Sequence, residues 1–212
     1  AFTNEARAAA TFRVALAEML APVFAARYPL HPEFNQTLSE TEVAQLVNGL
    51  FGGANQQEAS VQELARLFAE PLGLASLRGG SYTLEAGDQA LKQPWVREVL
   101  AMTDAAGGEV VPLDAVSRKL RGEPYGLERE SQYLILAALV AQRRIELVTL
   151  TGDRISRRTL DLKLRWDEIA GVARVATLLH SAEELTAWAR LLTEQEQLAS
   201  IAEPEARELV RA

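Results

Sequence analysis

Residues 109–158 constrain the fold more than any other part of this 212-residue chain. Apolar periodicity and turn-forming residues predict alternating strands and helices here. The expected elements are a strand at 109–112, helices at 114–120 and 127–142, and strands at 145–150 and 154–157. Gly122 and Pro124 mark a tight turn between the helices, and Thr151-Gly152-Asp153 suits a hairpin loop. This order of elements is typical of a winged helix-turn-helix.

A weaker version of the same order precedes this stretch. The expected elements are helices at 40–51 and 61–70 and strands at 74–77 and 81–84. Gly79 and Gly80 join the strands, because glycine readily adopts the positive φ angles of a tight hairpin. Two capping boxes are predicted at the helix starts, Ser39 with Glu42 and Ser60 with Glu63.

The remaining segments are expected to be helical. An apolar helix starting at Thr3 or Asn4 should run to Arg27, before Pro29. Further helices are predicted at 95–105 after Pro94, at 166–179, at 182–192 after a capping box of Ser181 and Glu184, and near the end of the chain.

The predicted fold is mostly α with small β-hairpins, as tandem winged-helix-like modules with flanking helices. Only 6% of the residues are aromatic, which favours aliphatic packing between helices. The expected divisions are an N-terminal helix and extended link at 1–36, a winged-helix-like module at 37–90, a winged helix-turn-helix module at 91–162, and a C-terminal helical segment at 163–212.

Charge is unevenly distributed along the chain. The net charge is -7, yet residues 118–165 carry eleven Lys or Arg and six Asp or Glu, which is 11 - 6 = +5. The rest of the chain carries 11 - 23 = -12. This separation places the cations where a winged helix would meet phosphate. The candidate DNA-binding residues are Arg118, Lys119, Arg121, Arg129, Gln132, Arg154, Arg157 and Arg158.

The helix expected to read bases has an unsuitable composition. Glu128 and Glu130 stand in its first turn, where carboxylates repel phosphate, and residues 133–141 are apolar on nearly every face. A helix that is apolar all round is normally buried, so this helix is expected to pack against another domain or subunit. Only Arg129, Ser131 and Gln132 are then left to reach base edges.

The chain offers no recognisable catalytic or cofactor site. It has no cysteine and no Walker A motif, and neither His31 nor His180 has a second metal ligand at a suitable spacing. We therefore expect no metal, no cofactor and no enzymatic activity in this segment. No run of 18 apolar residues exists, so no membrane span is expected and a cytoplasmic location is predicted.

Four segments of the sequence resemble a known family. PYGLERESQYLILAALVAQRRIELV, RWDEIAGVARV and SAEELTAWARLLTEQEQL, together with RYPLHPEF, resemble a C-terminal region of large P-loop ATPases. These ATPases belong to phage-defence systems of the phage-growth-limitation and BREX type. The resemblance spans roughly residues 25–212 and implies winged-helix modules that follow an ATPase core, with a methyltransferase and other defence proteins as partners. The family's functional motifs lie in the ATPase part, so no site residue transfers.

Three functions remain open from the sequence. The first is a non-catalytic DNA-contacting or assembly region of a larger phage-defence ATPase, with duplex DNA met through the wing. Because the chain lacks an initial Met and its last helix extends almost to Ala212, we expect a fragment of a longer protein. The alternatives are a free-standing tandem winged-helix transcriptional regulator and a pure protein-interaction scaffold.

Overall fold

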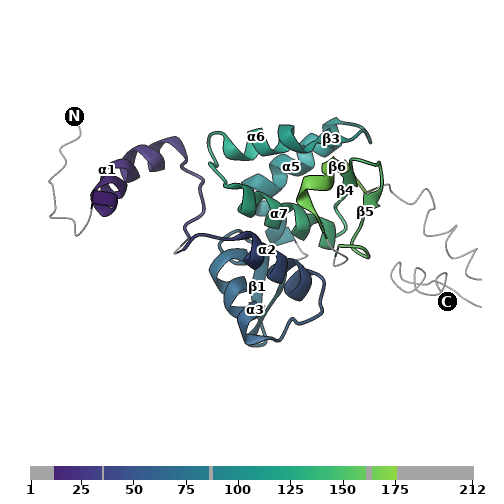
Figure 1. Ribbon diagram of the computed structural model, residues 1–212, viewed down its shortest axis with the longest axis horizontal. Coiled ribbons are helices and arrows are strands. Elements are labelled where there is room, and N and C mark those ends of the chain that lie inside the picture. Colours follow the sequence, from purple (N-terminus) through teal and green to yellow (C-terminus); the bar gives the residue numbers. More distant parts are fainter. Residues whose placement is uncertain (1–11, 35, 86–87, 161–163, 176–212) are drawn as a thin grey trace, which may run out of the picture. The chain divides into compact units, whose positions relative to one another are not determined.

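The structure is a computed structural model that describes residues 12–34, 36–85, 88–160 and 164–175 (Figure 1). The helical elements are α1 (Phe12–Arg27), α2 (Glu40–Leu46), η1 (Val47–Phe51), α3 (Ala59–Leu64), η2 (Ala65–Ala69), α4 (Asp88–Lys92), α5 (Pro94–Ala105), α6 (Leu113–Arg121), α7 (Arg129–Ala141) and η3 (Trp166–Glu168). The strands are β1 (Ala75–Arg78), β2 (Ser81–Leu84), β3 (Val111–Pro112), β4 (Ile145–Thr149), β5 (Arg154–Ile155) and β6 (Ile169–Arg174).

The described part of the chain is mixed α/β. Besides helices it contains two small antiparallel sheets. One is a hairpin of β1 and β2, and the other is a four-stranded sheet of order β3-β6-β4-β5. Helices and small hairpins are present as expected over residues 40–157, but the four-stranded sheet means that "mostly α" understated the strands. None of the described helices is long and apolar enough to cross a membrane.

The first module follows its predicted order of helices and hairpin. Ser39 caps α2 as expected: its backbone N–H donates to the Glu42 carboxylate at 2.7 Å, and its Oγ accepts from the Glu42 N–H. The chain then continues into η1, a π-helical turn. Gly79 and Gly80 close the hairpin with φ of 59° and 87°. The second predicted capping box is wrong, because α3 begins two residues earlier than predicted, after Glu58, whose carboxylate accepts from the Ser60 hydroxyl.

Hydrogen bonds of Gln62 connect α3 to the β1–β2 hairpin. The Gln62 side chain accepts a hydrogen bond from the Tyr82 N–H and donates one to the Tyr82 carbonyl oxygen, as a neighbouring strand would. Where η1 meets α3, an added Cβ on Gly49 would lie 2.7 Å from a Val61 methyl group. Glycine therefore permits close packing of the two helical segments.

The second module contains a strand that the sequence pattern did not predict. Residues 166–179 were expected to form a helix, but Ile169–Arg174 is β6, which lies between β3 and β4. Val172 is opposite both Val111 and Leu147, so pairing on both sides stabilises the strand. The sheet thus extends beyond the predicted module limit at residue 162. The helices expected at 182–192 and near the end of the chain, and residues 4–11, lie outside the described residues.

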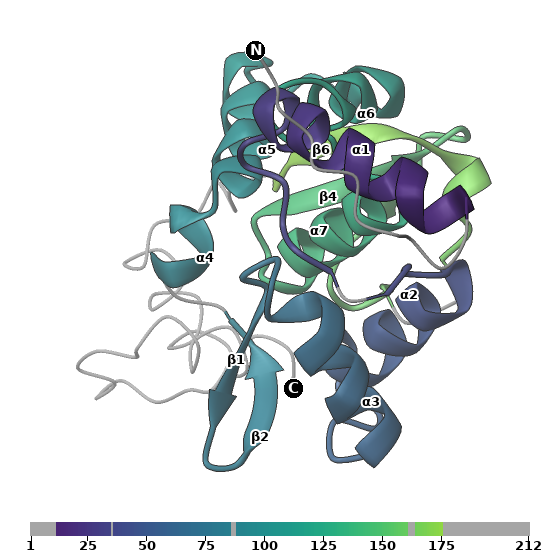
Figure 2. The same ribbon diagram turned by 90° about the vertical axis from the view of Figure 1, so that its left-hand side faces the viewer.

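Helix α7 lies at the centre of the core. Its residues from Leu134 to Ala141 are all buried, and the helix contacts α6, β4, α2 and η1 (Figure 2). The first module therefore supplies part of the surface that encloses the most apolar helix of the second. This confirms the expected burial of the helix and identifies its neighbour as another part of the same chain.

Candidate nucleic-acid interface

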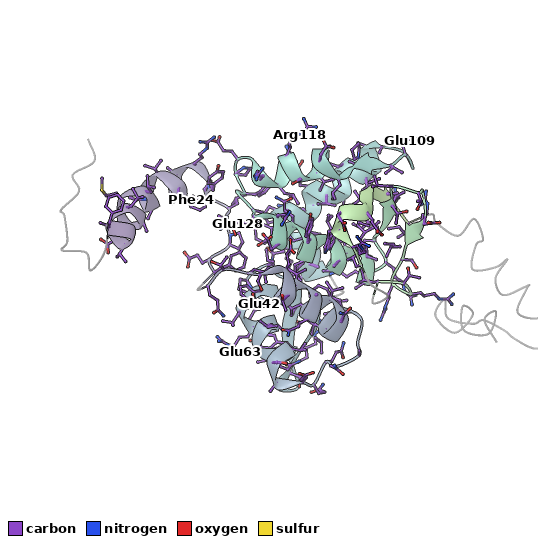
Figure 3. The ribbon with its side chains drawn as sticks, in the orientation of Figure 1. Phe24, Glu42, Glu63, Glu109, Arg118 and Glu128 are labelled. Atoms are coloured by element: carbon purple, nitrogen blue, oxygen red, sulfur yellow. The ribbon has the colours of Figure 1, made fainter. Side chains whose placement is uncertain are left out.

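The last turn of α6 carries three of the eight candidate DNA-binding residues. Arg118 pairs with Asp114 one turn earlier at 3.2 Å, and Lys119 pairs with Glu98 of α5 at 3.3 Å. Figure 3 shows Arg118 on the outer side of α6. Arg121 is exposed, and the ion pairs of the described residues do not include it. Arg121 is thus the α6 cation best able to accept a phosphate partner.

The first turn of α7 is a poor base reader. Gln132 is 3% exposed, and its amide donates to the Leu127 carbonyl oxygen at 2.8 Å. The prediction that Gln132 reaches a base edge is therefore wrong, because packing buries this face of the helix. Ser131 is equally buried. Arg129 is exposed, but it pairs with Glu40 of α2 at 2.6 Å and with Glu130 at 3.5 Å.

Two of the three wing cations, Arg157 and Arg158, are exposed and have no carboxylate partner among the described residues. Arg154 pairs with Glu146 across the hairpin at 2.9 Å. Arg157 and Arg158 lie in the turn that follows β5, and no ion pair within the described ranges includes either of them. Their turn is closed by the Thr159 hydroxyl, which donates to the Ser156 carbonyl oxygen and accepts from the Ser156 N–H. These arginines therefore project from an ordered turn.

The eight candidate residues differ in whether they can bind phosphate. Arg118, Lys119, Arg129 and Arg154 have carboxylate partners, and Gln132 is buried. Arg121, Arg157 and Arg158 have no such partner among the described residues. A paired guanidinium still carries charge, but its carboxylate cancels most of the field that attracts phosphate. The net positive charge predicted for this region is therefore largely neutralised locally, which charge counting along the sequence does not reveal.

A cavity of about 510 Å³ lies beside Arg129, where α2 and η1 face the start of α7 and residues 164–167. On its wall the rings of Tyr133 and Trp166 stack in parallel with centroids 4.1 Å apart. Burial raises the pKa of the Tyr133 hydroxyl, and nearby Arg129 opposes that shift. The sequence pattern does not predict this cavity, because it predicts a helix from Trp166 onwards.

The charged residues that line the cavity take part in ion pairs, Arg129 with Glu40 and Arg165 with Asp167. Among the described residues, no group of three His, Cys, Asp or Glu side chains is placed to hold a metal ion. The arrangement is suited to holding the two modules together.

The contacts of His31 are those of a residue that stabilises the fold. Its Nδ1 lies 2.9 Å from the Tyr125 carbonyl oxygen, and its ring makes edge contacts with Phe24 and Phe34. These contacts join the end of α1 to the turn that precedes α7. His180 lies outside the described residues.

Comparison of the chain with protein-family models, with curated proteins and with solved structures finds no match.

Proposed function

We propose that this chain is a non-catalytic assembly region of a larger phage-defence ATPase of the phage-growth-limitation or BREX type. The burial of α7 is the observation that carries the assembly role. A recognition helix must present its first residues to the major groove. Here Ser131 and Gln132 are buried, and α2 and η1 pack on the helix. A surface already occupied by protein favours positioning and assembly over sequence reading.

The element order supports a winged-helix-like second module. Helix α5, strand β3, helices α6 and α7, and strands β4 and β5 follow one another as in that class. One feature is unusual, because β6 rather than β5 pairs with both β3 and β4. The β4–β5 hairpin is therefore attached at the edge of the sheet, and Arg157 and Arg158 follow that edge strand.

Weak, sequence-independent contact with duplex DNA is the second candidate function. It is favoured by the exposure of Arg121, Arg157 and Arg158, and it requires only phosphate contacts. The buried first turn of α7 is compatible with this contact, since phosphate binding needs no base-reading helix. A free-standing regulator, by contrast, needs a base-reading surface, which α7 does not offer.

Duplex binding across a salt series tests these functions. Fluorescence anisotropy of a labelled duplex should show weak binding that unrelated duplexes compete equally. In the Arg157→Ala/Arg158→Ala variant, the log-log dependence of affinity on salt should become shallower by roughly 2 units. The matched control, Arg118→Ala/Arg129→Ala, removes two cations that have carboxylate partners and should change the slope by less than about 1 unit.

The results of the duplex-binding experiment distinguish the candidate functions. A preference of about a thousandfold for one sequence would contradict the assembly role and favour a regulator. If no binding occurs at low salt, the DNA contact is refuted and the assembly role remains. The reading frame gives an independent test, because an upstream P-loop in the same frame supports a region of a larger ATPase, whereas a free-standing gene contradicts it.

A further inference from the structure

The cavity beside Arg129 has the size of a site for a small molecule. Its volume is about 510 Å³. Ligand-binding cavities usually measure about 300–1,000 Å³, whereas packed protein interiors leave few spaces larger than a water molecule. The apolar part of the lining includes Val43 and Val47 from the first module and Leu164 from the second. Both modules therefore contribute to a cavity that a ligand could fill.

The wall of the cavity includes a flat aromatic surface. The rings of Tyr133 and Trp166 are parallel, with an interplanar angle of 0° and centroids 4.1 Å apart. The Arg129 guanidinium, one helical turn before Tyr133, lies 5.8 Å from the centroid of the tyrosine ring. Both aromatic side chains are half-buried, so packing helps to fix their positions. Such a wall favours a planar ring as the ligand, because planar rings stack on aromatic side chains.

The charged residues of the cavity favour a ligand without net charge. Two arginines and two carboxylates line it, so the formal charge of the lining is 2 - 2 = 0. Arg129 pairs with Glu40 and Arg165 with Asp167, and each arginine also contacts a second carboxylate outside the lining. An anion would have to compete with these carboxylates for the guanidinium groups. An uncharged ligand leaves the ion pairs intact.

Three polar groups of the lining can bond to such a ligand. The Asn48 amide, the Tyr133 hydroxyl and the Trp166 indole N–H have no hydrogen-bond partner among the described residues. A ligand that removes them from water must supply partners, because an unpaired buried polar group costs free energy. An aromatic side chain of a protein carries at most two polar atoms. A nucleobase carries ring nitrogens and exocyclic groups along its edge, and it therefore fits this lining better.

We propose that this cavity binds a nucleobase, supplied either by a free nucleoside or by an unpaired strand of nucleic acid. The base stacks against the Tyr133 and Trp166 pair, and the Asn48 amide bonds to the edge of the base, as asparagine does with adenine. A paired base in a duplex is stacked between its neighbours and does not reach the cavity. The proposal goes beyond the assembly role, and it depends neither on the duplex contact nor on phage defence.

Isothermal titration calorimetry of the full chain tests the proposal, with adenosine and uridine as the probes. We expect one saturable site with a Kd below about 1 mM for at least one of them. Trp166→Leu removes the planar ring and should weaken binding at least about 10-fold. Trp166→Phe keeps a planar ring and should restore part of that loss.

A pair of asparagine variants tests the polar contact. Asn48→Ala should weaken binding about 5-fold, because one hydrogen bond to the base is lost. The matched control is Asn55→Ala, since Asn55 is also exposed but does not line the cavity, and it should leave the affinity unchanged. Circular dichroism and thermal unfolding should be similar for both variants, because both side chains are exposed.

An unpaired strand of about eight nucleotides distinguishes the two sources of the base. If the strand binds at least about 10-fold more tightly than the nucleoside and Asn48→Ala weakens both, the base comes from a strand. Equal affinities point to a free nucleoside. The proposal is overturned if neither nucleoside binds saturably or if Asn48→Ala leaves the affinity unchanged. Tighter binding of N-acetyl-tryptophanamide than of either nucleoside would also overturn it, because the ligand would then be a protein side chain. None of these results bears on the duplex and reading-frame tests of the proposed function.

Discussion

Gly126 joins the turn before α7 to the end of α1. Its φ is 62°, and an added Cβ would lie 2.6 Å from the Tyr28 ring. Gly126→Ala combines left-handed backbone strain with a steric clash and should lower the free energy of unfolding by about 2–4 kcal/mol. Urea denaturation measures this change.

Gly107→Ala is the matched control for that substitution. Gly107 has a φ of 61°, but nothing lies within 4 Å of an added Cβ. Only the backbone strain should remain, about 1–2 kcal/mol. Equal losses in the two variants would show that the Tyr28 contact contributes nothing to stability.

Single residues were predictable where their conformation is local. The sequence located the hairpin glycines and the loop with Gly152, which has a φ of 88°. It did not predict that Gln132 is buried, which depends on tertiary packing, or that Arg129 meets Glu40, which lies 89 positions away in sequence. The sequence therefore identified the cations of the candidate interface, but not which of them already have carboxylate partners.

At the scale of elements, the two predicted capping boxes give a direct comparison. Ser39 and Glu42 form the reciprocal bonds at the start of α2, whereas Ser60 lies inside α3. Ser39→Ala should therefore cost about 1 kcal/mol of unfolding free energy. Ser60→Ala should stay within about 0.5 kcal/mol. Chemical denaturation of both variants checks the difference, and a larger loss for Ser60→Ala would contradict the assignment of the α3 start.

Helices and strands were predictable where the periodicity of apolar residues agrees with the residues that begin or end an element. Pro94 begins α5, and α7 lies within two residues of its expected bounds. Strand β6 was missed because Trp166, Val172 and the intervening residues also fit a helical pattern. Its position depends on pairing with β3 and β4, which are distant in sequence. Gly171 was an available signal, since glycine is a poor helix former and an added Cβ would clash with the Val111 carbonyl oxygen.

For the molecule as a whole, tyrosine ionisation predicts a loss of stability at alkaline pH. Burial, followed by the proximity of Glu98, raises the pKa of the Tyr125 hydroxyl above its ordinary value of 10.0. Burial likewise raises the pKa of Tyr133. A raised pKa in the folded state favours the protonated hydroxyl, so this stability is complete below pH 10 and is lost as pH rises through the folded-state pKa.

The free energy of unfolding, measured in urea between about pH 8 and pH 11, should fall above pH 10. In Tyr125→Phe/Tyr133→Phe the decline should be shallower, even if the variant is less stable throughout. An identical decline in the variant and the wild type would mean that other groups cause the pH dependence.

The central place of β6 also has a consequence for protein synthesis. Strand β3 leaves the ribosome well before its partner, because α6, α7, β4 and β5 are all translated between β3 and β6. Until Ile169–Arg174 emerges, both β3 and one side of β4 carry unpaired backbone groups, which readily pair with other chains. A nascent chain that stalls before β6 is therefore exposed to aggregation during the interval in which its apolar helix α7 is already complete.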